Sequence, residues 1–320
     1  MTIFITGGSG FVGLNLLEQL LARGESVVSL SLAPPPAQAK RAFDLLPGSL
    51  RHVDGDVCDP GAVEEALAQS GACQVVHAAV ITAGIDRERL DPASIVSTNV
   101  QGTVNVLDSA RRLGVDRFVY LSSASVYGAN ALADKELSEE HTAPLPESLY
   151  AVTKYAAEGI ARRFGAVFHM QVVAARLSAV FGRWEHDTGL RDTLSPPYLL
   201  ARMAAVGDAA VLADEGWRDW IYGPDVAAGI IALLDAPELR HDVYNVGTGE
   251  TWSLRQWCEK LVARRPSFSY RLGAESDVGT ALDPGRRSPL AIIRISQDTT
   301  YNPRFGLEES FEDYLEWLNG

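Results

Sequence analysis

The chain has 320 residues, of which 47% are hydrophobic, and a formal net charge of −13 at pH 7. Its basic residues are scattered and form no tract, which argues against nucleic acid or an anionic membrane as a partner and favours a small-molecule ligand. No stretch approaches the roughly 18 apolar residues of a membrane helix, so we expect a soluble, cytoplasmic protein with no membrane partner.

The three cysteines, Cys58, Cys73 and Cys258, are widely spaced and form no CxxC pair. An odd set of this kind is typical of buried thiols in a reducing compartment rather than of a disulfide framework. The spacing also gives no metal-ligand pattern, so we expect no metal site.

The N-terminal residues combine a strand pattern with a glycine-rich turn. An apolar run over residues 1–6 leads into Gly7, Gly10 and Gly13, and an amphipathic helix is expected over residues 12–23. Glycines let a pyrophosphate approach the unsatisfied N–H groups at the start of a helix. The pattern predicts a dinucleotide site, although a glycine turn without a ligand is the alternative. The expected cofactor contacts here are Gly7, Gly10, Phe11 and Val12.

Strand and helix patterns then alternate along the chain. The strands are expected over residues 26–32, 49–53, 73–79, 116–122 and 168–176, and the helices over residues 60–69, 94–113 and 148–164. Continuous rather than alternating hydrophobic residues in the strands are typical of a parallel sheet that is covered on both faces. We therefore predict a doubly wound α/β (Rossmann) dinucleotide-binding domain over residues 1–176.

After residue 176 the pattern changes to loops rich in Trp, Pro and charged residues. Short helices are expected near residues 198–205, 224–234, 254–264 and 309–318. We interpret residues 177–320 mainly as a smaller, C-terminal substrate-binding lobe. Within them, about 220–247 is expected to return to the first domain and to add a late strand near 244–247.

Tyr150 and Lys154 are four residues apart in a predicted helix, so their side chains share one helix face. Lowering a tyrosine pKa from about 10 toward 7 takes roughly 4 kcal/mol, much of which a nearby cation supplies. Ser123 and Ser125 follow a predicted strand, at the edge where parallel sheets bind ligands. We expect Tyr150 to act as the base, Lys154 to lower its pKa and Ser123 to polarise the substrate oxygen. Alone, a Tyr-x-x-x-Lys pattern would more often be a solvated helix face.

Together these motifs resemble the extended short-chain dehydrogenase/reductase family, which includes nucleotide-sugar epimerases and dehydratases such as UDP-galactose 4-epimerase. The resemblance covers nearly the whole chain. It implies an NAD(P)-dependent enzyme and a homodimer formed through the helices over 94–113 and 148–164. The further cofactor contacts that it implies are Asp56, Val57, Ala78, Ala79, Asn99, Tyr150, Lys154 and Ser178.

Three departures from the family pattern limit what the resemblance implies. Ser31 stands where NAD-dependent members have the aspartate that binds the adenosine ribose, so we expect NADP or NAD as cofactor, with a slight preference for NADP. Ala179 stands where an asparagine usually contacts the sugar nucleotide, which favours a smaller substrate. The Asp-Glu pair of the family's 4,6-dehydratases is missing after Ser123, which argues against dehydration.

Charged side chains are dense after residue 182, and a carboxylate or phosphate on a substrate needs a forked cation. The alternative interpretation is that each of these charged side chains lies on a solvated loop and contacts no ligand. The resemblance adds Arg218, which lies where family members contact substrate phosphate. The expected substrate contacts are Ser125, Ala179, His186, Arg191 and Arg218.

These expectations favour an oxidoreductase that moves a hydride to or from a secondary alcohol of a carbohydrate-like substrate, such as a sugar, a sugar acid or a related polyol. A nucleotide-sugar 4-epimerase of the same family is the first alternative. A non-catalytic NAD(P)-sensing regulator is the second, and the presence of Ser123, Tyr150 and Lys154 argues against it.

Overall fold

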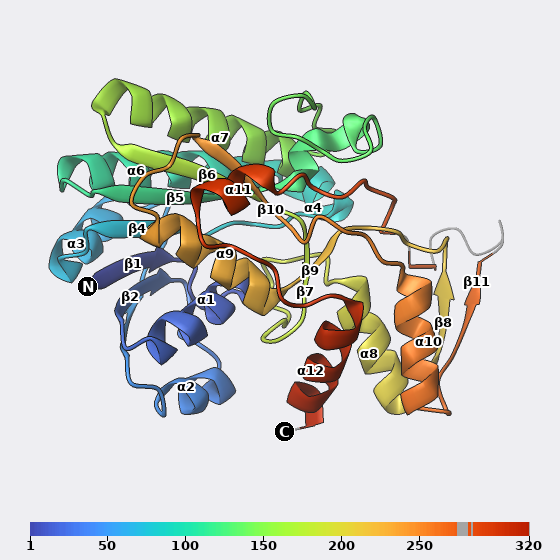
Figure 1. Cartoon of the computed structure of the whole chain (residues 1–320). Coiled ribbons are helices and arrows are strands. Elements are labelled where there is room, and N and C mark those ends of the chain that lie inside the picture. The colour runs from blue at the N-terminus through green and yellow to red at the C-terminus, as the bar shows by residue number, and fades with distance from the viewer. Residues whose placement is uncertain (274–280, 283, 320) are drawn as a thin grey trace.

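A parallel sheet forms the centre of the computed structural model, which describes residues 1–273, 281–282 and 284–319 (Figure 1). Its strands lie in the order β10-β6-β5-β4-β1-β2-β3, and all neighbours are parallel. Their bounds are β1 Thr2–Thr6, β2 Ser26–Ser31, β3 Ser49–Asp54, β4 Gln74–His77, β5 Arg117–Ser123, β6 Gln171–Leu177 and β10 Val243–Val246. The predicted doubly wound α/β fold is confirmed.

Helices cover both faces of this sheet (Figure 1). One face carries α3 Pro60–Ser70, α6 Gly102–Arg112 and α7 Leu149–Phe168, and the other carries α1 Phe11–Ala22, α2 Ala37–Phe43 and α9 Gly223–Asp235. Within β1, Ile3 and Ile5 belong to the core under α1 and α9, whereas Phe4 belongs to the core under α3, α6 and α7. Successive side chains of a strand point to opposite faces, so a sheet with two cores needs apolar residues at every position.

The C-terminal lobe lies beside the carboxyl ends of the central strands (Figure 1). It contains α8 Pro196–Val206, α10 Leu254–Arg264, α12 Leu307–Asn319, and two small parallel sheets made of β7 Ala179–Phe181 with β9 Trp220–Tyr222, and β8 Ala209–Leu212 with β11 Ser269–Leu272. Its core is aromatic: the buried Trp257 ring lies 5.4 Å from the Trp252 ring and 5.0 Å from the Phe311 ring.

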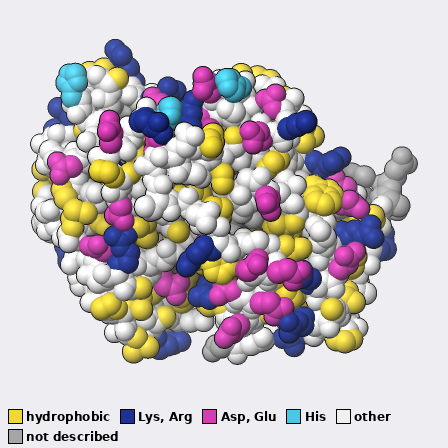
Figure 2. Space-filling model, in the orientation of Figure 1, with side chains coloured by type: hydrophobic (Ala, Val, Ile, Leu, Met, Phe, Trp, Pro, Cys, Tyr) yellow, Lys and Arg dark blue, Asp and Glu magenta, His cyan; other side chains and the backbone are white. Residues whose placement is uncertain are grey.

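Acidic side chains gather over α12 on the face shown in Figure 2. Two of them, Glu308 and Glu312, form ion pairs with Lys260 and Arg264 of α10. These pairs are largely exposed, so they contribute little to stability beyond linking the two helices.

The chain returns from the lobe to the sheet through β10, which pairs with β6, and through α9, which shares a core with α1. The side chain of Gln19 on α1 also donates a hydrogen bond to the Pro224 carbonyl, at 2.6 Å. Trp184 and Tyr301, from outside the first 176 residues, belong to the same core. Because the two parts interleave in this way, the boundary near residue 177 stays a prediction.

The long helix expected over 94–113 is interrupted. It consists of α5 Pro92–Val96, one π-helical turn over Ser97–Gln101, and α6. Asn99, in the π turn, donates to the Ile81 carbonyl and accepts from the Ile81 N–H, so the turn secures the chain that follows β4. A helical hydrophobic pattern continues through such an interruption, and π turns occur often at functional sites.

The expected strand at 168–176 begins later, because Phe168 ends α7 and His169 caps it with a left-handed backbone (φ 56°). Three short helices were not expected, namely α2, α4 Ile85–Leu90 and α11 Ile293–Asp298. Helices of six or seven residues are held by tertiary packing rather than by their own periodicity.

The prediction of three buried thiols is correct only for Cys258, because Cys58 and Cys73 are half-buried; all three are free. Burial raises the pKa of Cys258 to about 12. Within the part of the chain that the structure describes, no cluster of His, Cys, Asp and Glu side chains is arranged to hold a metal ion. Over the same residues, no helix combines the length and the apolar character needed to cross a membrane.

The turn between β1 and α1 depends on its glycines to different degrees. Gly7 has a φ of +71°, and a Cβ there would lie 2.7 Å from the Ala79 Cα. A Cβ at Gly13 would lie 2.4 Å from the Gly7 carbonyl oxygen and 2.6 Å from the Gly8 Cα. At Gly10 an added Cβ would meet only the Gly7 oxygen, at 3.2 Å. Packing therefore requires glycine at positions 7 and 13 but not at position 10.

We expect Gly13→Ala to lower the free energy of unfolding by about 1–3 kcal/mol, because the new methyl group overlaps rigid backbone. Gly10→Ala is expected to change it by less than about 1 kcal/mol, because a small shift of one carbonyl is enough. Urea unfolding of both variants measures the difference. Equal destabilisation by the two substitutions would contradict this account of the turn.

Candidate active site

Helix α7 begins beside the carboxyl end of β5. Ser148 caps the helix by accepting the Ala151 N–H at 3.2 Å. One turn into the helix, the buried Lys154 ammonium donates to the Leu121 carbonyl of β5 and lies 4.6 Å from the centroid of the Tyr120 ring. The carbonyl and the ring fix the ammonium against the end of the strand.

The hydroxyls of Ser123 and Thr82 lie beside the phenol of Tyr150 and act to lower its pKa, which burial raises. Ser123 is the last residue of β5, and its Oγ also accepts the Ser125 N–H at 3.2 Å. The structure thus brings the three predicted catalytic side chains, Ser123, Tyr150 and Lys154, into one cluster. It adds Thr82, whose only sequence signal is its place shortly after a predicted strand.

The surroundings shift the acidity of both ionisable partners. Burial raises the pKa of Tyr150, whereas the hydrogen bonds from Ser123 and Thr82 and the positive charges of Arg191 and Arg287 lower it. Burial also lowers the pKa of Lys154 to about 7, against the opposing charge of Glu158. Because burial penalises each charge alone, phenolate and ammonium form more readily as a pair than separately.

A buried ion pair lies behind Lys154, one turn further along α7. The fully buried Glu158 carboxylate accepts from Arg176 Nη2 at 2.6 Å and from the Ser122 hydroxyl at 2.7 Å. Arg176 also donates to the Tyr127 hydroxyl, which donates to Asn245 Oδ1 of β10 at 2.9 Å. The network connects α7 to β5, β6 and β10 directly behind the candidate catalytic residues.

Backbone and side-chain groups at the glycine turn fit a dinucleotide. Gly10 is the N-cap residue of α1 and has no side chain to cap the helix, which leaves N–H groups of the first turn for an anion. Ser31 ends β2, and its buried hydroxyl accepts the Ser9 N–H at 3.3 Å. The Ser9 Oγ is itself buried and has no partner among the described residues.

Of the other expected cofactor residues, some lie beside the glycine turn or at the surface, and others are held by hydrogen bonds or packing within the chain. Ala78 and Ala79 follow β4 directly beside Gly7, and Asp56 is exposed after β3. The Asn99 amide also donates to Thr153, and the Ser178 hydroxyl donates to the Asp219 carbonyl at 2.6 Å. Val57 is buried, and its carbonyl accepts from Asn105. Asn99, Ser178 and Val57 are therefore held mainly by contacts within the chain.

The expected substrate residues are not all free to bind a ligand in the same way. His186 Nδ1 is 2.9 Å from the Trp184 carbonyl oxygen, and Arg218 Nε donates to the Gly285 carbonyl at 2.9 Å. Ala179 begins β7 and is half-buried. The Ser125 Oγ is buried and has no partner within the described ranges. Ser125 thus offers an unused hydroxyl two residues after Ser123.

The chain matches known proteins over its whole length. It is 29% identical to the low-salt glycan biosynthesis protein Agl12 of Haloferax volcanii, over 99% of this chain and 96% of that one. It is also 29% identical to UDP-glucuronate 4-epimerase 4 of Arabidopsis thaliana, over 74% of this chain but only 55% of that protein. The structure of MoeE5 in complex with UDP-glucuronic acid and NAD is similar with a TM-score of 0.81 and 26% identity, over 100% of this chain and 99% of that one.

Residues 3–247 match the model of the NAD dependent epimerase/dehydratase family. This match confirms the predicted family resemblance and agrees with the parallel sheet and the glycine turn described above. It also removes the interpretation as a non-catalytic regulator, because the family consists of enzymes. The chain belongs to the NAD dependent epimerase/dehydratase family.

Proposed function

We propose that this enzyme moves a hydride between a nicotinamide cofactor and a secondary alcohol of a carbohydrate-like substrate, with Ser123, Tyr150 and Lys154 as its catalytic residues. The contact of the Tyr150 phenol with the Ser123 hydroxyl, one helical turn from the Lys154 ammonium, carries the proposal. The NAD bound by MoeE5 and the sugar substrates named for the relatives support it.

In this proposal Tyr150 removes the proton from the substrate hydroxyl, while a bound nicotinamide supplies the site that accepts or returns the hydride. Ser123 donates a hydrogen bond to the substrate oxygen and holds the phenol in place. The Lys154 ammonium favours the phenolate, and the Leu121 carbonyl keeps that ammonium at the end of β5. Thr82 is a second hydroxyl that orients Tyr150.

We also infer that residues 1–176 bind the cofactor and that the lobe within 177–320 binds the substrate. The backbone of Gly7, Gly10, Phe11 and Val12 would hold the pyrophosphate, and Ser31 would lie at the adenosine ribose. A homodimer through the helical residues 94–113 and 148–164, which include α6 and most of α7, is part of the proposal. Apolar side chains exposed on this side of the sheet, including Val152 on α7 (44% exposed), support it.

A nucleotide-sugar 4-epimerase is the second candidate, supported by the full-length similarity to a dTDP-glucose 4,6-dehydratase and a UDP-glucose 4-epimerase. Arg218, at the position that the family resemblance assigns to substrate phosphate, also supports it. An epimerase would use the same residues but return the hydride to the opposite face of the sugar. Incubation with NAD or NADP and a panel of sugars, sugar acids and nucleotide sugars separates the two. Net cofactor reduction indicates a dehydrogenase, and sugar interconversion without reduction indicates an epimerase. If no member of the panel gives either cofactor reduction or sugar interconversion, the proposal is overturned.

We expect Tyr150→Phe to lower kcat by about 10² to 10⁴ and to leave cofactor affinity nearly unchanged, because only the phenolic oxygen takes part in proton transfer. Tyr155→Phe removes a hydroxyl from the same helix and serves as the control. Steady-state kinetics and cofactor titration provide the two measurements. A Tyr150→Phe variant that keeps more than about a tenth of the wild-type kcat would rule out Tyr150 as the base.

Gly10→Val is expected to weaken dinucleotide binding by about 10-fold or more, because branched atoms would occupy the space in front of the first turn of α1. The fold should survive, since the backbone at Gly10 is ordinary (φ −80°). Titration by intrinsic fluorescence measures affinity, and Gly159→Val, at an open position on α7, is the control. Unchanged affinity for both NAD and NADP would contradict the assignment of this turn.

Because position 31 is a serine and not the aspartate of NAD-dependent members, no carboxylate lies there to repel the 2′-phosphate of NADP. We therefore expect the wild type to bind NADP at least as well as NAD. Ser31→Asp should shift the ratio of dissociation constants toward NAD by at least 10-fold, about 1.4 kcal/mol. Ser26→Asp, at the exposed opposite end of β2, controls for added charge. A wild type that already prefers NAD tenfold would mean that another group compensates for the serine.

A further inference from the structure

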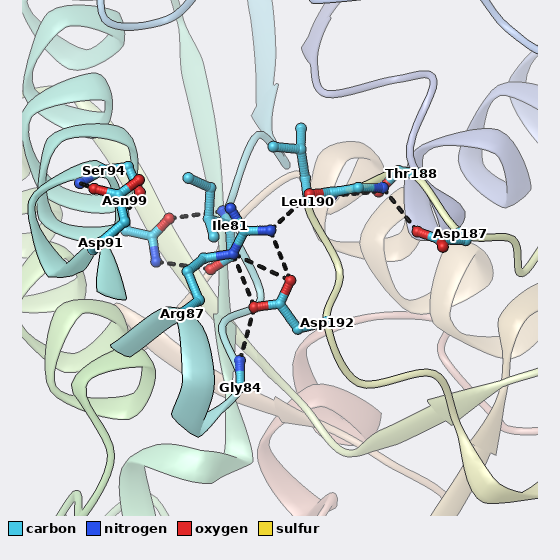
Figure 3. Close-up of polar contacts among 11 residues, drawn as sticks. Ile81, Gly84, Arg87, Asp91, Ser94, Asn99, Asp187, Thr188, Leu190 and Asp192 are labelled. Atoms are coloured by element: carbon cyan, nitrogen blue, oxygen red, sulfur yellow. Dashed lines mark hydrogen bonds and ion pairs between the residues drawn. The ribbon is translucent and has the colours of Figure 1, made fainter. Parts of the chain in front are cut away.

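The loop between β7 and α8 is fastened across the segment that follows β4 (Figure 3). The Thr82 N–H donates to the Leu190 carbonyl at 2.9 Å, and the Asp192 N–H donates to the Thr82 carbonyl at 3.0 Å. Arg87 donates to both carboxylate oxygens of Asp192, at 2.7 and 2.8 Å, and to the Gly189 carbonyl at 2.7 Å. We call residues 189–192 the strap.

The strap determines where Arg191 lies. Asp192 is turned toward Arg87, and neighbouring side chains of an extended segment point to opposite sides. Arg191 accordingly contacts the other side, where its guanidinium carbon is 4.9 Å from the centroid of the Phe11 ring and its Nη2 is 3.0 Å from the buried Glu185 carboxylate. Its Nε is buried and has no hydrogen-bond partner in the described part of the chain.

The same backbone bridge places Arg191 near the candidate base. Thr82 pairs with Arg191 in a backbone bridge, and its neighbour Ile81 is hydrogen-bonded to Asn99. Asn99 donates to Thr153, whose hydroxyl donates to the Tyr150 carbonyl, so the bridge is connected to the turn of α7 that carries Tyr150. The buried, unpartnered Ser125 Oγ lies two residues beyond Ser123, whose Oγ accepts the Ser125 N–H at 3.2 Å. Two unused polar groups, a guanidinium N–H and a hydroxyl, thus lie near the proposed site of proton transfer.

A guanidinium has five N–H donors, and Glu185 uses one side of this one. A buried N–H without an acceptor is unfavourable, so a ligand that supplies an anionic oxygen would be bound more strongly than a neutral one. Arg191 contacts Phe11 at the first turn of α1 and is also paired with Thr82, in the segment that Asn99 joins to α7 beside Tyr150. This second connection favours an anionic group on the substrate over the pyrophosphate of the cofactor.

We propose that Arg191 binds a carboxylate of the substrate close to the reacting alcohol, so that the enzyme selects sugar acids over the corresponding neutral sugars. Ser125 donates a second hydrogen bond to the same carboxylate. Arg87 and Asp192 are positioning residues that hold the strap and thereby Arg191. The inference rests on the proposed function, because it places the carboxylate relative to Tyr150.

Two matched pairs of probes test the proposal, glucuronate with glucose and UDP-glucuronate with UDP-glucose, since each pair differs only in a carboxylate against a hydroxymethyl group. Calorimetric titration of the enzyme saturated with NAD or NADP measures binding without requiring turnover. We expect the wild type to bind the acid of at least one pair 10- to 100-fold more tightly, as expected for a hydrogen-bonded charge. Equal affinities within both pairs would overturn the proposal.

Arg191→Gln should reduce the preference for the acid to about threefold or less and leave the affinity for the neutral sugar and the cofactor unchanged. Because this variant leaves Glu185 buried without its cation, Arg191→Lys is the second variant. It keeps the charge and should retain part of the preference. If Arg191→Gln instead weakens cofactor binding, Arg191 contacts the pyrophosphate. If it lowers the affinity for acid and neutral probes equally, Arg191 stabilises the fold and does not select the acid.

Arg87→Met tests the strap while leaving Arg191 in place, and we expect it to reduce the preference for the acid about 3- to 10-fold. The control is Arg162→Met, which removes a similar arginine–aspartate pair (Nε to Asp242 Oδ2, 2.7 Å) twelve residues beyond Tyr150 on α7. An unchanged preference in Arg87→Met would remove the positioning role. Hydride transfer without acid preference would overturn only this inference, whereas acid preference without hydride transfer or epimerisation would overturn only the proposed function.

Discussion

The buried ion pair between Arg176 and Glu158 is the interaction on which the geometry of the site depends. It joins a helix to a strand where neither side chain has access to water, so removing one partner would leave an uncompensated charge and cost about 3–5 kcal/mol. Glu158 lies one turn from Lys154, and Lys154 lies one turn from Tyr150. The pair therefore fixes the rotation of α7 about its axis, and with it the direction in which the phenol and the ammonium point.

The parallel sheet explains why distant residues meet at this point. All strands present their carboxyl ends to one edge, so the turn after β1, the segment after β4 and the serines at the end of β5 converge although they are far apart in sequence. The lobe then closes over that edge through the contact of Asp192 with Arg87. Trp184 of the lobe also belongs to the apolar core under α1 and α9, so the strap adds its hydrogen bonds and one ion pair to a lobe that is already anchored by apolar packing.

Sequence reasoning predicted the features that are encoded locally. The glycine turn, the central strands and the spacing of Tyr150 and Lys154 each depend on residues within one or two turns or strands, and the structure has them close to the expected bounds. Thr82, the π turn at Asn99 and the pairing of Arg87 with Asp192 were missed. Each depends on a distant partner: Asn99 contacts Thr153, Arg87 contacts Asp192 and Thr82 contacts Leu190. A single sequence carries no periodic signal for such pairs.

The departure at Ala179 and the position of Arg191 have a common physical meaning. An asparagine amide at position 179 would recognise a neutral hydroxyl or carbonyl, and a methyl group removes that capacity from β7. Across the site, the strap supplies a guanidinium with a buried, unsatisfied N–H, whose natural partner is an anionic oxygen. If Arg191 binds the substrate carboxylate as proposed, polar recognition lies on a cation of the strap and not on a neutral amide at position 179. Such a change alters which substrates bind while leaving the Ser123, Tyr150 and Lys154 cluster intact.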